Sequence, residues 1–292
     1  MVWTNLHYIP LAVFVLLPTT FITTYIIAIL LGHVEVELPY ISDTGTHVPE
    51  SSLFAQLLNF CAFLVGVTIY VRYKQIEQYY RDNLTPESTK IFCRNRIAFI
   101  CGLISSVGLS MVANFRELEL FKIHMVGATL AFGFGAIYCW LQTIMSYAMH
   151  PLVNSRQMAH FRLALSSLMT CTFTVSCVCG PWAMRYFHGK DPTNWKPEDG
   201  AFGLHLAATV CEWITALAID FFVLSYVEEL KKISMSTPKV LFIIEEDIER
   251  FGDNMSETDD TVAIIHASLP SNLRSSPATT EMVIHSNPPI IH

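Results

Sequence analysis

The chain has 292 residues and a formal net charge of −7, with 52% hydrophobic residues and only 15% charged residues. Soluble domains carry roughly 25% charged residues, so this composition excludes an ordinary soluble protein. The charged residues thin out in six apolar stretches, which indicates an integral membrane protein. Much of the acid lies near the C-terminus, and the chain has no basic patch of the kind that binds nucleic acid.

The apolar stretches predict an all-α membrane protein, a six-helix transmembrane bundle that occupies residues 1–235. A helix of roughly 20 residues crosses the hydrocarbon core of a bilayer. The expected spans are residues 9–31, 53–71, 97–113, 121–147, 163–184 and 202–224. No basic residue precedes the first span, so we expect it to be retained rather than cleaved as a signal peptide. Residues 236–292 form an acidic tail rich in Ser, Thr and Pro, which predicts a largely disordered segment.

The distribution of Lys and Arg predicts the orientation of the bundle. The connections 72–96 and 148–162, with the start of the tail, hold eleven Lys and Arg, whereas connections 32–52, 114–122 and 185–201 hold five. Cytoplasmic connections carry an excess of these residues. We therefore expect both termini in the cytosol, and the segment between the first two spans in the lumen or outside the cell.

That first connection contains a polar segment, residues 39–51, which we call the hinge. It has no Lys or Arg but includes Asp43, His47 and Glu50, two prolines and an Asp-Thr-Gly sequence. Pro and Gly favour defined turns, because Pro fixes φ and Gly tolerates positive φ. The hinge is therefore predicted to be a short ordered turn, and alternatively a recognition surface or the lid of a site.

Ionisable residues within the spans point to a candidate site on the lumenal side. A charged residue at mid-bilayer costs about 2.5–3.5 kcal/mol on insertion scales, yet the sixth span contains His205, Glu212 and Asp220. His124 lies at the lumenal end of the fourth span. We expect five groups to converge in the lumenal half of the bundle: Asp43, Glu50, His124, His205 and Glu212.

This cluster has four interpretations. It could hold a metal, sense protons or bind a lipid headgroup, or Glu212 could simply lock helix packing through a hydrogen bond. A metal site is disfavoured, because no element carries two ligands at a spacing such as His-x₃-His. No metal or cofactor is therefore expected.

Two further patterns concern packing and sorting. Gly127, Ala131 and Gly135 recur every fourth residue on one face of the fourth span, which predicts a seam where another helix approaches closely. Tyr73 and Ile76 fit a tyrosine-based sorting signal that lies close to the membrane. An acidic dileucine-like signal in the tail would comprise Asp260, Ile264 and Ile265.

Several ordered segments carry a family resemblance. They are residues 38–46, 49–50, 69–75, 109–115, 127–128, 132–133, 142–143, 195–199, 212–213 and 226–234, together with His124, Tyr138 and His205. Over residues 1–235 the chain resembles the damage-regulated autophagy modulator (DRAM) family, grouped with the Frag and Sfk membrane proteins, and is most similar to its second member. The tail matches no family segment.

The resemblance implies a six-pass endomembrane protein, typically lysosomal or late endosomal, that promotes autophagy without an enzymatic mechanism. It implies as partners autophagy or lysosomal proteins and membrane lipids, of which phosphoinositides and sterols are linked to distant relatives. From the residues alone, two other functions stay open. One is a lipid- or solute-binding transporter that uses the lumenal cluster. The other is an intramembrane hydrolase, which is disfavoured because no nucleophile–base pair is recognisable.

Overall fold

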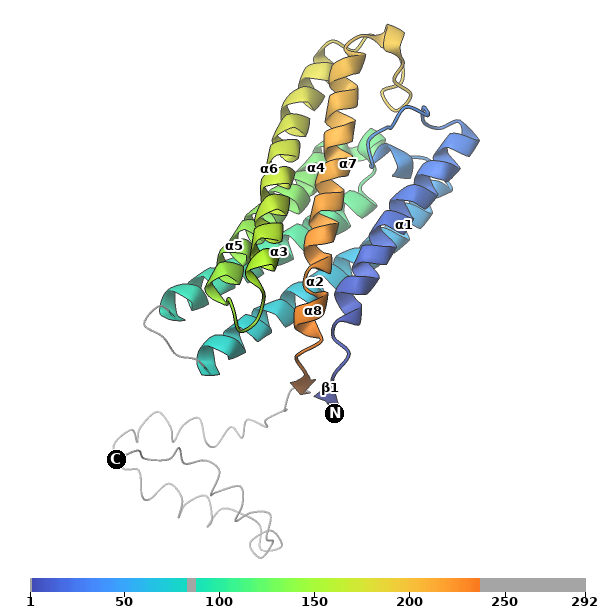
Figure 1. Cartoon of the computed structure of the whole chain (residues 1–292). Coiled ribbons are helices and arrows are strands. Elements are labelled where there is room, and N and C mark those ends of the chain that lie inside the picture. The colour runs from blue at the N-terminus through green and yellow to red at the C-terminus, as the bar shows by residue number, and fades with distance from the viewer. Residues whose placement is uncertain (1, 83–87, 237–292) are drawn as a thin grey trace, which may run out of the picture. The chain divides into compact units, whose positions relative to one another are not determined.

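The structure is a computed structural model in which residues 2–82 and 88–236 are described. Its long helices run side by side (Figure 1). Six helical stretches are long and apolar enough to cross a membrane, with mean hydropathy between 1.5 and 2.2. The six-helix, all-α prediction is therefore confirmed, while the tail from residue 237 lies outside the described residues. The helices are α1 (Tyr8–Leu31), α2 (Glu50–Asp82), α3 (Ser88–Asn114), α4 (Glu117–Ala128), α5 (Gly135–Ala148), α6 (Arg156–Arg185), α7 (Phe202–Leu224) and α8 (Val227–Leu230).

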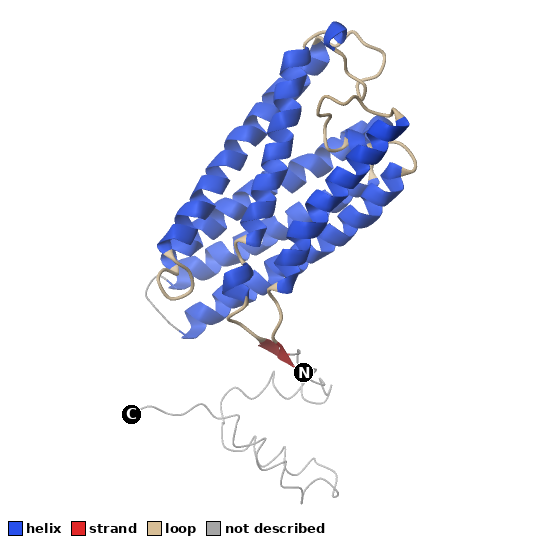
Figure 2. Ribbon diagram, turned by 45° about the vertical axis from the view of Figure 1, so that its right-hand side comes forward, coloured by secondary structure: helices blue, strands red, loops and turns tan. Residues whose placement is uncertain are grey.

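The helices form a closed ring. α1 packs on α2 and α7, α2 packs on α3, α3 packs on α4 and α5, α5 packs on α6, and α6 packs on α7. Figure 2 shows these helices side by side with the connecting loops gathered at the two ends. Large apolar side chains such as Val15, Leu30 and Phe63 are exposed on the outside. A bilayer solvates such an apolar surface, and each helix satisfies its own backbone hydrogen bonds there.

A short pairing brings the N-terminal segment next to the end of α8. Strand β1 (Val2–Trp3) pairs with strand β2 (Met235–Ser236) in antiparallel register, with Val2 opposite Ser236. The two segments therefore lie at the same end of the ring, as Figure 1 shows for β1 and α8. An even number of spans places the two ends of the bundle on the same side of the membrane. Which side of the membrane that end faces stays a prediction.

Three helices, α2, α3 and α6, continue beyond the apolar runs from which the spans were predicted. Most of residues 72–96 is helical, because α2 ends only at Asp82 and α3 begins at Ser88. Ile76, Tyr80 and Ile91 are buried there and extend the core between the two helices. α6 likewise begins at Arg156 rather than Leu163, and its N-terminus is capped by the Ser155 hydroxyl, which accepts a bond of 3.1 Å from the Met158 N–H.

The fourth span is irregular in two places. Leu120 has φ −131° and ψ 50°, so the first turn of α4, which carries Glu117, is offset from the rest of the helix. A π-helical turn, η2 (Thr129–Phe134), joins α4 to α5. The Ser105 hydroxyl of α3 donates to the Ala131 carbonyl within this turn over 2.7 Å. Such turns occur frequently at functional sites.

The small residues of the fourth span lie against α3. A Cβ added to Gly127 would lie 2.8 Å from the Cβ of Met111 and 3.1 Å from the Val112 nitrogen. A Cβ on the facing Gly108 would lie 2.4 Å from the Ala131 nitrogen. At Gly135 the nearest atom would be the Ser105 hydroxyl, at 3.0 Å. This close backbone approach is what small residues permit.

Candidate functional site

The hinge packs as a lid over one end of the ring. Gly32 ends α1 in the left-handed region, with φ 71°, and turns the chain towards the hinge. Within the hinge, Thr44 is fully buried and its hydroxyl lies 2.9 Å from that of Thr24 on α1. Gly45 leaves room for the Phe54 ring, which would lie 2.5 Å from an added Cβ. Of the interpretations above, the short ordered turn and the lid thus describe the same structure.

Two membrane carboxylates hold the hinge in place. Oε2 of Glu212 on α7 accepts a bond of 3.1 Å from the Ile41 backbone N–H. The next residue, Trp213, donates its indole N–H to the Pro39 carbonyl over 2.9 Å. On α4, Oε2 of Glu117 accepts from the Ser42 hydroxyl over 2.6 Å. The hinge therefore bridges α4 and α7 through neighbouring residues.

His124 completes this polar group. Its Nδ1 lies 2.7 Å from the Phe115 carbonyl, an oxygen that can only accept, so Nδ1 carries the hydrogen. Its Nε2 lies 3.9 Å from Oε2 of Glu117. The carbonyl thus fixes the orientation of the imidazole and directs the other nitrogen towards the carboxylate.

Beneath the hinge lies a cavity of about 470 Å³, which we call the lateral cavity. Its polar lining includes Tyr40, Ser42, Glu117, His124 and Glu212, and the hydroxyl residues Thr129, Ser176 and Thr215 line it as well. Its apolar lining comes from α4, the π-helical turn and α6, and includes Phe121, Met125, Phe132, Phe173 and Met184. Phe121, Met125 and Met184 are exposed on the outer surface of the ring, so the cavity opens sideways between α4 and α6. In a bilayer this opening meets lipid.

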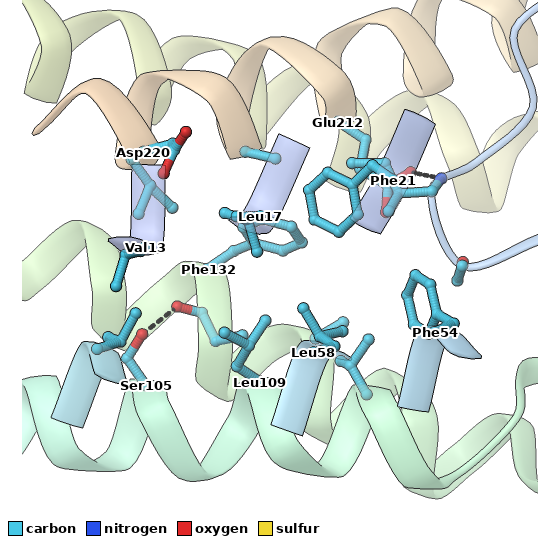
Figure 3. A pocket seen from close by; sticks show the side chains of 18 of the residues that line it. Val13, Leu17, Phe21, Phe54, Leu58, Ser105, Leu109, Phe132, Glu212 and Asp220 are labelled. Carbon is cyan, nitrogen blue, oxygen red and sulfur yellow. Dashed lines mark hydrogen bonds between the residues drawn. The ribbon is translucent and has the colours of Figure 1, made fainter. Parts of the chain in front are cut away.

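A second, smaller space lies inside the ring. This central cavity of about 80 Å³ shares His124, Phe132 and Glu212 with the lateral cavity. Figure 3 shows Glu212 and Asp220 on α7 above a mostly apolar space lined by α1, α2 and α3. Both carboxyl oxygens of Asp220 are buried and have no hydrogen-bond partner among the described residues. A volume of this size holds only a few water molecules, since each occupies about 30 Å³ in the liquid.

Asp43 lies in the hinge close to the same carboxylates. It is 4% exposed, and its Oδ2 accepts a bond of 3.1 Å from the Tyr40 N–H. Burial raises the pKa of Asp43 well above its ordinary value, and the negative charges of Glu117 and Glu212 raise it further. The Tyr40 N–H opposes this increase only in part. The hinge therefore favours a protonated Asp43.

Two of the five expected residues lie outside this group. Oε1 of Glu50, at the start of α2, lies 2.5 Å from Nδ1 of His33. The His33 ring is 4.8 Å from the His47 ring, measured between centroids. The His205 ring stacks on Trp195 of the 186–201 loop with 4.3 Å between ring centroids, and it lies nearly perpendicular to the Tyr40 ring with 5.3 Å between centroids. The lateral cavity thus brings together His124 and Glu212 under the hinge that holds Asp43, while Glu50 and His205 hold the surrounding loops.

Sequence reasoning missed two residues of the polar group, Glu117 and Ser42. Glu117 was assigned to a short connection, because four charged residues follow the third span closely. The detectable signal was an acidic residue seven positions before His124, which places both on one face of a helix. The kink at Leu120 disturbs that register but keeps the two side chains within 3.9 Å.

Sequence reasoning also missed a buried charge cluster near the opposite end of the ring. Glu229 of α8 pairs with Arg72 of α2, and with Arg162 of α6 over 2.6 Å. Both guanidinium groups lie over the Tyr226 ring, at 5.0 and 4.7 Å from its centroid. Both arginines had been counted as connection charges. The detectable signal was the position of each Arg, which lies within one helical turn of an apolar run. A charged side chain at such a position is usually paired with another charged residue or with a backbone carbonyl.

The two sorting residues of α2, Tyr73 and Ile76, are held within the folded bundle. Ile76 is fully buried in the core and Tyr73 stacks on Phe99 at 4.7 Å, both within the helix α2. An adaptor would have to unwind this helix to bind the pair in extended form. Asp260, Ile264 and Ile265 lie outside the described residues.

Within residues 2–82 and 88–236, no group of three His, Cys, Asp or Glu side chains is placed to hold a metal ion.

Comparison with known proteins gives consistent matches over the bundle. Residues 5–233 match the family described as the Frag1/DRAM/Sfk1/Cwh43P N-terminal domain. DNA damage-regulated autophagy modulator protein 2 of Mus musculus is 40% identical over 240 residues, which cover 79% of this chain and 86% of that protein. DNA damage-regulated autophagy modulator protein 1 of Mus musculus is 36% identical, covering 74% and 87%. Modulator of macroautophagy TMEM150B of Danio rerio is 30% identical, covering 66% and 69%. No solved structure matches the chain.

Proposed function

Since the chain belongs to the Frag1/DRAM/Sfk1/Cwh43P family, we propose that it is a non-catalytic modulator of autophagy that acts by binding a membrane lipid in the lateral cavity. We propose that it resides in lysosomal or late endosomal membrane and passes the state of the cavity to protein partners. The names of its relatives support the process, because they describe modulators of autophagy or macroautophagy.

The lateral cavity is the observation that carries the lipid-binding part of the proposal. Its volume of about 470 Å³ lies within the range of roughly 300–1,000 Å³ that is usual for small-molecule sites. It combines apolar walls with a few polar groups at one end, which is the pattern that orients an amphiphile. Two hinge residues, Tyr40 and Ser42, line the cavity, so an occupant would contact the hinge.

The coupling from ligand to partner would run through this contact. Glu212 and Glu117 each bond a hinge residue and also line the cavity. A lipid head group that binds either carboxylate competes with or reinforces its bond to the hinge. Occupancy would therefore shift the hinge between two arrangements, because a ligand shifts an equilibrium by its difference in affinity for the two states.

A cavity-filling substitution tests this function. Ser176 is half-buried on α6 and lines the lateral cavity, so Ser176→Phe should fill part of it. Ser167, on the exposed face of the same helix, gives the matched control Ser167→Phe. In cells lacking the protein, wild type and Ser167→Phe should restore autophagic flux and reach lysosomes, whereas Ser176→Phe should reach lysosomes without restoring flux. Full rescue by Ser176→Phe would refute a role for the cavity.

A transporter of a small solute is the second candidate, favoured by the central cavity. Glu212 and Asp220 line this cavity from two successive stretches of α7, and unpartnered carboxyls inside a membrane protein commonly mark ion or proton paths. Asp220→Asn separates the two functions. It should abolish solute or proton flux in reconstituted vesicles if the protein is a transporter, and should leave rescue of autophagy intact if the lateral cavity carries the function.

A further inference from the structure

We propose that the lateral cavity selects a lipid with a positively charged amine head and a single hydrocarbon chain, a long-chain primary amine of the sphingoid type. This inference rests on the proposed function, because it names the class of lipid that the cavity binds. It follows from the donor and acceptor groups at the polar end of the cavity.

Apart from the Tyr40 hydroxyl, which can donate or accept, the polar end offers mainly acceptors. Glu212 and Glu117 use Oε2 to accept from the Ile41 N–H and the Ser42 hydroxyl. Each therefore retains an Oε1 without a hydrogen bond from the described residues. The Nε2 of His124 is directed towards Glu117 as well. An ammonium group has three donors and no acceptor, so it complements these oxygens.

The ionisable groups at this end are acidic, apart from His124 and Tyr40. Two carboxyl groups line the cavity, and no Lys or Arg is among its described lining residues. Arg116, the nearest cation in sequence to Glu117, pairs with Glu119 and donates to the Thr46 carbonyl over 3.4 Å. An anionic phosphate would therefore face carboxyl groups with no paired cation among the described lining residues, which disfavours its binding. The lining therefore favours an amine, which forms charge-assisted hydrogen bonds with carboxylates, over a phosphoinositide headgroup.

The apolar walls determine the rest of the ligand. Phe132 and Phe173 close the inner end of the cavity, with ring centroids 5.9 Å apart. Phe121 and Met184 line the side that opens on the outer surface of the ring. A single chain can therefore leave the cavity between α4 and α6 and continue in the bilayer, while the amine stays beneath the hinge.

Photo-crosslinking of the full-length protein in lipid nanodiscs tests the ligand class. The probe is a long-chain primary amine with a diazirine in its chain. Competitors are the unlabelled amine, its N-acetylated form, its phosphate ester and a sterol. We expect crosslinked peptides from α4 and α6, and competition by the amine at concentrations about tenfold lower than by the N-acetylated form, as expected when one charge-assisted bond is lost.

Matched variants test whether the amine binds at Glu117 and Glu212. Glu117→Gln should weaken labelling about tenfold. Glu119→Gln, which changes an exposed carboxylate two residues away, should not. Glu212→Gln should weaken labelling similarly, and its thermal unfolding checks that the hinge still packs. Equal labelling of wild type and Glu117→Gln would overturn the assignment.

The possible failures are distinguishable. If the sterol or the phosphate ester competes as well as the amine, the lipid class is wrong, while lipid binding in the cavity stands. If the amine labels the cavity but Ser176→Phe still restores autophagic flux, the lipid class stands and the proposed function fails. If no probe labels α4 or α6 above background, both are wrong.

Discussion

Asp43 is a buried carboxyl group in the hinge, so its protonation state affects the stability of the folded protein. Burial and two neighbouring carboxylates raise its pKa well above the ordinary value. The folded protein therefore binds a proton at Asp43 that the unfolded chain releases, between the ordinary pKa of about 3.9 and the raised value. In this interval stability falls as pH rises, because the folded state binds more protons than the unfolded state.

Asp43→Asn should remove this dependence. An amide keeps the size of the protonated carboxyl and can still accept from the Tyr40 N–H, so the variant should be more stable than wild type at pH 7.5. The gain should be about 1.4 kcal/mol for each unit by which the pKa is raised, and it should shrink as the pH is lowered towards 5. Thermal unfolding in detergent at both pH values measures it. A constant difference between the two proteins would show that Asp43 does not titrate in this interval.

At the scale of elements, α3 and α4 approach each other closely because Gly108 and Gly127 carry no side chain at their contact. Gly127→Ala should destabilise the bundle by about 1–3 kcal/mol, as overpacking does, because the new Cβ would lie 2.8 Å from Met111 and 3.1 Å from a backbone nitrogen. Gly133→Ala is the control, because its nearest neighbour would be the Phe173 ring at 4.0 Å. It should be neutral or slightly stabilising, since Ala is the better helix former. Equal stability of the two variants in thermal unfolding would contradict the seam.

The cluster of Arg72, Arg162 and Glu229 joins α2, α6 and α8. Arg162 also donates to the Ser225 hydroxyl over 2.8 Å and to the Ser146 hydroxyl over 2.7 Å. Both guanidinium groups pair with Glu229, which is the one carboxylate paired with them among the described residues. We therefore expect Glu229 to stabilise the contact between the three helices.

Glu229→Gln should cost about 3–5 kcal/mol, the usual effect of leaving buried charges unpaired. The adjacent Glu228→Gln is the control, since the Glu228 side chain is exposed and forms its ion pair with the neighbouring Lys231. It should leave thermal unfolding and the yield of folded protein unchanged. If both variants unfold at the same temperature as wild type, the cluster does not stabilise the bundle.

At the scale of the whole molecule, hydropathy predicted the number of helices because a membrane span must satisfy its backbone hydrogen bonds within one apolar segment. The polar extensions of α2 and α6 escaped prediction, because Arg72 and Arg162 read as the ends of spans by composition alone. Their burial depends on Glu229, more than 60 residues further along the chain.

The candidate site was predictable only in part for the same reason. The carboxylate and imidazole on α7 and α4 are unusual within a span, so Glu212 and His124 stood out. Which loop each residue holds depends on tertiary packing. Glu50 lies at a helix start beside His33, and His205 lies beneath Trp195. The spacing of residues within one helix or loop does not reveal that Glu50 and His205 lie outside the lateral cavity.

The orientation of the bundle in the membrane stays a prediction. Because Arg72 and Arg162 are buried, they no longer count among the Lys and Arg of the expected cytosolic side. Removing them from the eleven Lys and Arg of the expected cytosolic side leaves nine against five, so the N-terminus and the end of α8 should still face the cytosol. A tag in the hinge would disrupt its buried contacts, so the lumenal tag belongs after Lys190, which is exposed in the 186–201 loop. In intact vesicles, added protease should remove a tag at the N-terminus and spare the tag after Lys190, and detergent should expose both. The reverse pattern would place the lateral cavity and its hinge on the cytosolic side, where the acidic lumen of the proposed lysosomal location could not act on Asp43.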